Sequence, residues 1–198
     1  ALIALHGNDV VPVKALGLDA GRTTQGHRFE AATPRIEIRN ADSYAAQLRE
    51  QGAVIADFNE RRGEIEAHLA RAAQSQGLQP IRDEALLDEV AALVERPKVL
   101  LCQFEQQFLD VPQECLILTM KANQKYFPLL GAQGKLTNRF LVVSNVSPED
   151  PARVVQGNER VVRPRLADAK FFFDQDRKTK LADRLERLGS VVYHNKLG

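Results

Sequence analysis

Three short segments of the sequence gather side chains that could bind phosphate or nucleobases. In the first, "GRTTQGHRF", Arg22, His27 and Arg28 lie beside two glycines, where backbone amides could approach a phosphate closely. A turn that packs on its neighbours through Phe29 would have the same composition. The segment is therefore a candidate anion site with a structural alternative.

The second segment, "TMKANQKYF", places Lys121, Gln124 and Lys125 directly before Tyr126. Amines that reach phosphates, next to a ring that stacks on an unpaired base, are typical of RNA recognition. A helix end that runs into a strand would look the same. The sequence leaves both interpretations open.

The third segment, "GNERVVRPRLADAKFFFDQD", combines arginines with three consecutive phenylalanines. If the chain from Arg153 onward is helical, steps of 100° per residue separate two faces. The apolar stripe consists of Val155, Val162, Leu166, Ala169 and Phe173. Arg153 and Arg160 face the opposite way, and Arg163 lies at the edge of their side. We expect the phenylalanines to pack in the core and the arginines to face solvent or a partner.

Pro164 lies in the middle of this segment and lacks the amide that a helix interior needs. Its ring also clashes with the preceding turn, so the sequence predicts a kink or a fresh helix start near it. Asn158 and Glu159 precede the apolar run and could serve as caps.

Signatures of common enzymes are missing from the sequence. It has no GxxxxGK[ST] loop, no GxGxxG after a strand, no HExxH and no GxSxG. The four histidines share no spacing with carboxylates or cysteines. Cys102 and Cys115 lie in apolar surroundings, as buried free thiols do in a reducing compartment. We therefore predict no catalytic residue, no metal site and no bound cofactor.

The composition is that of an ordinary globular protein, with 198 residues, 44% hydrophobic and 27% charged. No apolar run approaches the roughly 20 residues of a membrane span, and no signal peptide is visible, so we expect a cytoplasmic protein without a membrane partner. The ends, Ala1 and Gly198, suggest a piece of a longer chain. Net charge is +1, but residues 45–95 are rich in acids and residues 115–148 contain none. This imbalance predicts a basic face in the second half.

The elements expected from periodicity and capping alternate between strands and helices. Strands are expected around a turn at Gly7–Asp9 and over 34–39 and 98–104, with a hairpin formed by "KYFPLL" and "RFLVVSNV". Helices are expected at 42–52, 57–77 with a capping box of Asp57 and Glu60, 83–97, and from Pro112 onward. Asp150 should open a helical segment over 150–190, followed by "SVVYH" as a final strand or its docking segment. The sum is a single α/β domain over 1–198, a mixed α+β sheet with flanking helices and a helical C-terminal third.

Six strings follow one another in order along the chain: "GHRF", "VIADFNERR", "LLDEVAALVERP", "FLDVPQECLILTMKANQKYFPL", "GKLTNRFLVVSNV" and "GNERVVRPRLADAKFFFDQDRK". Together they resemble the beta subunit of the bacterial, two-subunit-type glycyl-tRNA synthetase, across nearly the whole chain. The resemblance implies an internal part of that subunit, after its N-terminal region and before its HD-type domain.

The resemblance also implies partners and a division of labour. In this family the alpha subunit carries the class II centre that uses ATP, Mg and glycine, and the beta subunit is needed for tRNA binding, in an α2β2 assembly. The region is similar in kind to the α/β editing-type domain in the large chain of phenylalanyl-tRNA synthetase. Within the family pattern, matching positions are Lys121, Gln124, Lys125, Tyr126, Asn158, Glu159, Arg163 and Arg165.

These arguments lead to one set of candidate RNA-binding residues and three functions. The residues are Arg22, His27, Arg28, Lys121, Gln124, Lys125, Tyr126, Arg153, Asn158, Arg160, Arg163 and Arg165. The leading hypothesis is a non-catalytic module that binds tRNA and holds subunits together. A vestigial or active hydrolytic editing domain is the alternative, although a tight glycine pocket excludes larger amino acids without editing. A third possibility is a subunit scaffold that does not touch RNA.

Overall fold

A four-stranded antiparallel sheet forms the centre of the computed structural model, which describes residues 1–192. Its strand order is β7 (Gln79–Pro80), β9 (Phe127–Leu130), β10 (Leu136–Ser144) and β8 (Lys98–Gln103). β9 and β10 form the expected hairpin, in which Leu141 lies opposite Phe127. Side chains alternate across β10, so Phe140 and Leu141 enter different cores on the two faces of the sheet.

Helices α2 (Phe58–Gln74) and α3 (Glu84–Leu93) cover one face of the sheet. Asp57 caps α2 as predicted, because its carboxylate accepts the amide of Glu60 at 2.8 Å. The Glu60 carboxylate, however, lies 2.8 Å from Arg49 Nη2 and forms an ion pair there. Asp83 caps α3 in the same way as Asp57 caps α2, through the amide of Leu86.

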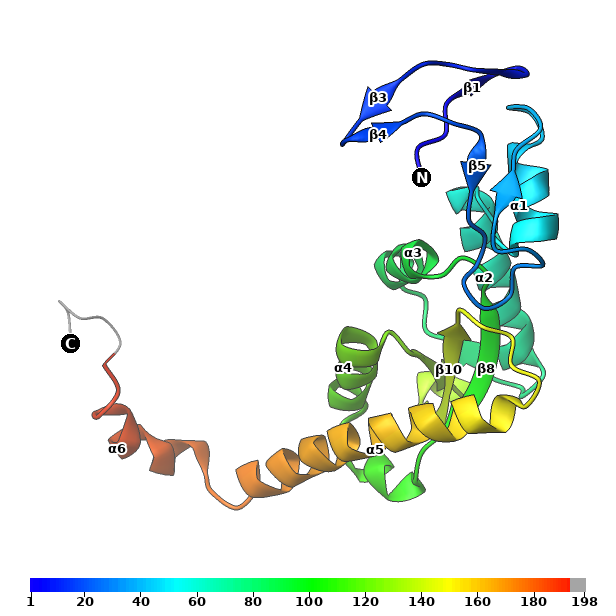
Figure 1. Ribbon diagram of the computed structural model, residues 1–198. Helices are drawn as coiled ribbons and strands as arrows, with labels where there is room; N and C mark the ends of the chain where they lie inside the picture. The colour runs from blue at the N-terminus through cyan, green and yellow to red at the C-terminus, as the bar shows by residue number, and fades with distance from the viewer. Residues whose placement is uncertain (193–198) are drawn as a thin grey trace.

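The other face of the sheet is covered by the short 3-10 helix η1 (Gln106–Asp110), by α4 (Gln113–Gln124) and by α5 (Pro151–Asp176). β8 is therefore packed on both faces, with Cys102 in this core and Leu101 in the core of α2 and α3. The strand expected at 98–104 is thereby confirmed, one residue shorter at its end. The molecule is a mixed α/β protein with a sheet between two helical layers (Figure 1).

The first 52 residues build a smaller part from three two-stranded pairs and one helix. The pairs are β1 (Leu5–His6) with β2 (Asp9–Val10), β3 (Lys14–Ala15) with β4 (Leu18–Asp19), and β5 (Thr23–Thr24) with β6 (Ile36–Glu37). With α1 (Tyr44–Gly52) they enclose a core of Ile36, Ile38 and Leu48. The predicted turn at Gly7–Asp9 is confirmed. Figure 1 shows this part, in blue and cyan, at the opposite end of the molecule from the C-terminal end of α5.

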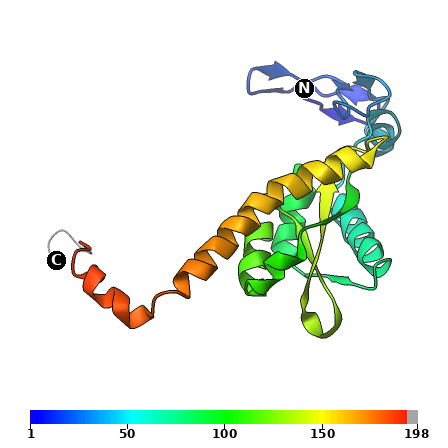
Figure 2. The same cartoon turned by 90° about the horizontal axis from the view of Figure 1, so that it is seen from below.

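The C-terminal part of the described chain is helical and extends away from the sheet. α5 is followed by the 3-10 helix η3 (Leu181–Arg184) and the single turn α6 (Leu185–Leu188). Figures 1 and 2 agree that the last turns of α5 project beyond α4. Ser190–Val192 do not form the predicted strand, and the rest of "SVVYH" lies outside the described residues. No helix among residues 1–192 is long and apolar enough to cross a membrane.

Candidate nucleic-acid interface

α5 has the two faces that its periodicity predicts. The helix begins at Pro151, and the Asp150 carboxylate caps it by accepting the amide of Ala152 at 3.0 Å. Val162 and Leu166 are fully buried, and the other members of the apolar stripe pack on the same core: Val155, Ala169 and Phe173. Arg153 and Arg160 are exposed on the opposite side. The stripe is therefore confirmed, and it turns one line of arginines to solvent.

Pro164 does not start a new helix, so the fresh helix start that the sequence offers as one of two outcomes is wrong. α5 runs as one helix from Pro151 to Asp176 (Figure 2). Pro164 is exposed, four residues after Arg160 on the same side. The carbonyl of Arg160, which loses its helical donor, therefore faces the side where water can replace it.

Two of the three phenylalanines are outside the core, which corrects the expectation that all three pack inside. Phe173 lies in the apolar stripe, whereas Phe171 and Phe172 are 56% and 64% exposed. Three consecutive helical residues span about 200°, so only one of them can lie on a narrow stripe. The rings of Phe171 and Phe172 meet edge to face, with centroids 5.5 Å apart.

The arginines of α5 differ in whether another residue already engages them. Arg163 forms an ion pair with Glu105, the residue before η1. Among residues 1–192, no side-chain hydrogen bond or ion pair engages Arg153, Arg160 or Arg165. The only acid between residues 151 and 167 is Glu159, and its carboxylate accepts the amide of Gln103 at 2.9 Å. The first four turns of α5 therefore present uncompensated positive charge.

Tyr126 and Asn158 bind each other inside the fold. The Tyr126 hydroxyl donates to Asn158 Oδ1 at 2.8 Å, and Asn158 Nδ2 donates to the carbonyl of Val154 at 2.8 Å. The Tyr126 ring is 3% exposed and stacks on Phe140. Burial raises the pKa of Tyr126 to about 12. Both side chains thus join the end of α4 to α5, and neither presents itself to a ligand.

Lys121 and Lys125 of the second segment lie against acids of α3. Lys121 forms an ion pair with Asp83, and Lys125 Nζ lies 2.9 Å from Glu89 Oε1. The hydrogen bond from Lys121 lowers the pKa of Asp83. The acid-rich and acid-free blocks of the sequence therefore neutralise each other across the α3–α4 contact. Gln124 is half-buried at the end of α4.

Of the three candidate residues in the N-terminal loop, Arg22, His27 and Arg28, only Arg28 has an exposed side chain. The Arg22 guanidinium donates to the carbonyls of Asn8 at 2.7 Å and Arg39 at 3.2 Å, and so ties the strand pairs together. His27 is 2% exposed, and its Nδ1 accepts the amides of Phe29 and Glu30, each at 3.2 Å. The Arg28 guanidinium lies 5.5 Å from the centroid of the exposed Phe29 ring. Arg22 and His27 therefore serve to pack the loop on its neighbours, as in the alternative to an anion site, and do not face a ligand.

The structure does not gather the twelve candidates into one site. Four of them are exposed and have no hydrogen-bond or ion-pair partner for their side chains among residues 1–192: Arg28, Arg153, Arg160 and Arg165. Three of these share α5, so the candidate interface is its solvent side. No group of three or more His, Cys, Asp and Glu side chains in the described residues could hold a metal ion. The exposed Phe171 was missed as a candidate, although its helical phase relative to Arg153 could have indicated it.

A family model described as "Glycyl-tRNA synthetase beta subunit" matches residues 1–198. The chain therefore belongs to the glycyl-tRNA synthetase beta subunit family, which confirms the resemblance. It is 70% identical over 197 residues to the glycine–tRNA ligase beta subunit of Leptothrix cholodnii, and 71% identical over 200 residues to that of Delftia acidovorans. The corresponding protein of Methylobacillus flagellatus is 71% identical over 197 residues. Each match covers 100% of this chain and 28% of the relative's length.

Proposed function

We propose that this chain is a part of the beta subunit of glycine–tRNA ligase that binds tRNA through the solvent side of α5 and contributes no catalytic group. The ligase attaches glycine to its tRNA with ATP. The names of the relatives support the ligase, and the unpaired arginines of α5 support the tRNA contact.

Charge distribution is the observation that carries this proposal. Arg153, Arg160 and Arg165 are exposed on one helix and have no acidic partner among residues 1–192. Arginines that neutralise phosphates release condensed counterions, which is the main source of affinity for nucleic acids. Lys121, Lys125 and Arg163 are already paired with carboxylates and would have to leave them first.

The test is tRNA binding by the full-length beta subunit together with its alpha subunit. Arg153→Gln combined with Arg160→Gln should weaken binding and reduce the slope of log K against log salt by about two, roughly one per lost phosphate contact. Lys14→Gln is the control, because it removes an exposed positive charge far from α5. Unchanged affinity and slope in the double variant would show that α5 does not hold phosphates.

The expected partners are tRNA and the glycyl-tRNA synthetase alpha subunit, in an α2β2 assembly in the cytoplasm. ATP and Mg are used by the alpha subunit, and this chain also serves as a scaffold between subunits. Native mass spectrometry of the two co-expressed subunits would test the assembly. Deletion of residues 181–192, which carry no buried side chain, would then show whether the extension beyond α5 holds the assembly together.

A vestigial or active editing domain, similar in kind to that of phenylalanyl-tRNA synthetase, is the alternative function. It would need a nucleophile with a base beside it. Cys102 is a poor nucleophile, because burial raises its pKa to about 12. His27 Nδ1 is occupied by two backbone amides. Deacylation of mischarged tRNA by the beta subunit above the rate in buffer would nevertheless favour editing.

A further inference from the structure

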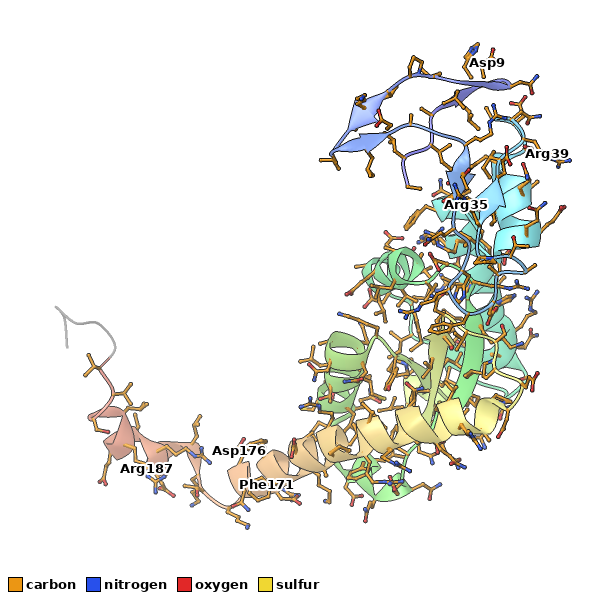
Figure 3. The ribbon with its side chains drawn as sticks, viewed as in Figure 1. Asp9, Arg35, Arg39, Phe171, Asp176 and Arg187 are labelled. Atoms are coloured by element: carbon orange, nitrogen blue, oxygen red, sulfur yellow. The ribbon has the colours of Figure 1, made fainter. Side chains whose placement is uncertain are left out.

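The exposed ring of Phe171 lies on the same side of α5 as the exposed arginines Arg153 and Arg160. Phe171 lies near the end of the helix that projects from the sheet, as Figure 3 shows. It follows Arg153 by 18 residues, which is five helical turns, so the two side chains leave the helix in the same direction. Arg160 lies about 20° from this line. Two arginines and one ring therefore share a single line about 27 Å long.

Apart from the two arginines, the surface along this line carries no charged side chain. Gly157 and Pro164 are exposed between the charged and aromatic positions, and neither carries a charge. Asp168, about 60° from the line, is the nearest acid along the helix. The next two acids are engaged, since Asp174 lies 3.3 Å from Lys170 Nζ and Asp176 lies 3.0 Å from Arg184 Nη2.

We propose that Phe171 is a stacking platform for an unpaired base of an RNA whose phosphates are held by Arg153 and Arg160. This inference rests on the proposed function, and it adds the kind of nucleotide that the site takes. Unpaired bases stack on aromatic side chains, while arginines along the same groove or ridge hold the backbone. The ligand is therefore RNA that passes from a backbone-contacted segment into at least one unstacked nucleotide.

RNA fits this line better than a protein does. A protein partner would have to place carboxylates opposite two unpaired arginines as well as an apolar pocket over the ring, whereas every nucleotide of RNA carries a phosphate. The phosphates of RNA complement these charges, and a base covers the ring without needing an apolar pocket. A contact with another subunit is the competing outcome of the test.

The first experiment replaces the ring with a photoreactive one. A full-length beta subunit with Phe171→p-benzoylphenylalanine, assembled with its alpha subunit and tRNA, should yield cross-linked tRNA on irradiation. The same replacement at Phe172, which leaves the helix about 100° away, should yield less. Cross-links to protein alone, or no tRNA adduct at position 171, would overturn the proposal.

The second experiment separates stacking from apolar contact by binding measurements on the same complex. Phe171→Leu keeps an apolar side chain but removes the ring, and should weaken tRNA binding by about fivefold to 150-fold, the range for one lost base–aromatic stack. Phe171→Tyr should stay within about twofold, and neither variant should alter the salt dependence. Val161→Ala, which shortens another exposed apolar side chain of α5 and leaves the touching rings of Phe171 and Phe172 in place, is the control and should stay within about twofold.

The possible failures of the two proposals are distinct. If the Arg153 and Arg160 double variant weakens binding while Phe171→Leu does not, the stacking platform is wrong and the phosphate contacts stand. If Phe171→Leu and Val161→Ala weaken binding equally, the effect does not come from the ring and the stacking platform is wrong. If no variant changes binding, both proposals fail.

Discussion

At the scale of single residues, Tyr126 shows how the fold uses a polar group that looked available for RNA. Its hydroxyl lies inside the protein and donates to Asn158, which in turn is fixed to the backbone of α5. Replacing either partner would leave the other with an unsatisfied polar atom. Such a pair stabilises the fold and orients α5 at the same time.

The raised pKa of Tyr126 gives a stability prediction with a defined pH range. The folded state keeps the hydroxyl proton up to about pH 12, whereas an ordinary tyrosine loses it near 10.0. The contribution to stability is therefore complete below pH 10 and is lost as pH rises through 12. Tyr126→Phe should unfold more easily at pH 8, by about 1 kcal/mol.

The measurement is urea unfolding of the protein and of Tyr126→Phe over the range pH 8 to 12. The difference in unfolding free energy should shrink at the upper end. A difference that stays constant would mean that the hydroxyl is not buried as described.

At the scale of elements, α5 combines a correct prediction with two wrong ones. Its apolar stripe followed from steps of 100° per residue, because a helix long enough to cross the sheet must keep one face toward it. The fresh helix start at Pro164 did not occur, because the proline faces solvent. Only Phe173 of the three phenylalanines lies on the stripe, because adjacent helical residues point in directions about 100° apart.

Pro164 provides the prediction for α5. Pro164→Ala restores an amide opposite the carbonyl of Arg160 and removes the ring from a helix interior, so unfolding should require about 1–3 kcal/mol more. Gln156→Ala, at another exposed position of α5, is the control and should change stability by no more than about 0.5 kcal/mol. Thermal unfolding measures both, and an unstable Pro164→Ala variant would contradict the account.

Elements defined by local rules were predictable, and contacts between distant elements were not. Asp57, Asp83 and Asp150 cap the helices that they open, as a sequence rule states. The pairing of Asp83 with Lys121 depends on how α3 and α4 meet, and no spacing within one segment reports it. The same is true of Arg22, whose partners are backbone carbonyls with no sequence signature.

At the scale of the whole molecule, the strand pairs of the first 52 residues are held against the end of α1 by a close backbone joint. The amide of His27 donates to the carbonyl of Gly52 at 2.6 Å. A Cβ at Gly26 would lie 2.6 Å from Gly52 Cα and 2.8 Å from Ala31 Cβ. Arg61 of α2 donates to the carbonyl of Ile55, just after α1, and to that of Ala91 in α3, and so links this part to the larger one.

This joint predicts opposite effects for two glycine replacements. Gly26→Ala should lower the free energy of unfolding by about 1–3 kcal/mol, because backbone has to move away from the new methyl group. Gly63→Ala, in the interior of α2 with open space around it, should raise it by about 0.5–1 kcal/mol. Urea unfolding measures the change in free energy for both variants. Equal changes for Gly26→Ala and Gly63→Ala would show that the backbone contact at Gly26 is not tight.

The continuity of α5 through Pro164 has a consequence for selectivity. Because one continuous helix carries both Arg153 and Phe171, the distance between these two side chains is fixed and does not adjust to a ligand. If α5 binds RNA as proposed, the RNA must bring a phosphate and an unpaired base to that fixed distance. Selection would then depend on the reach and flexibility of the RNA strand rather than on the identity of its bases.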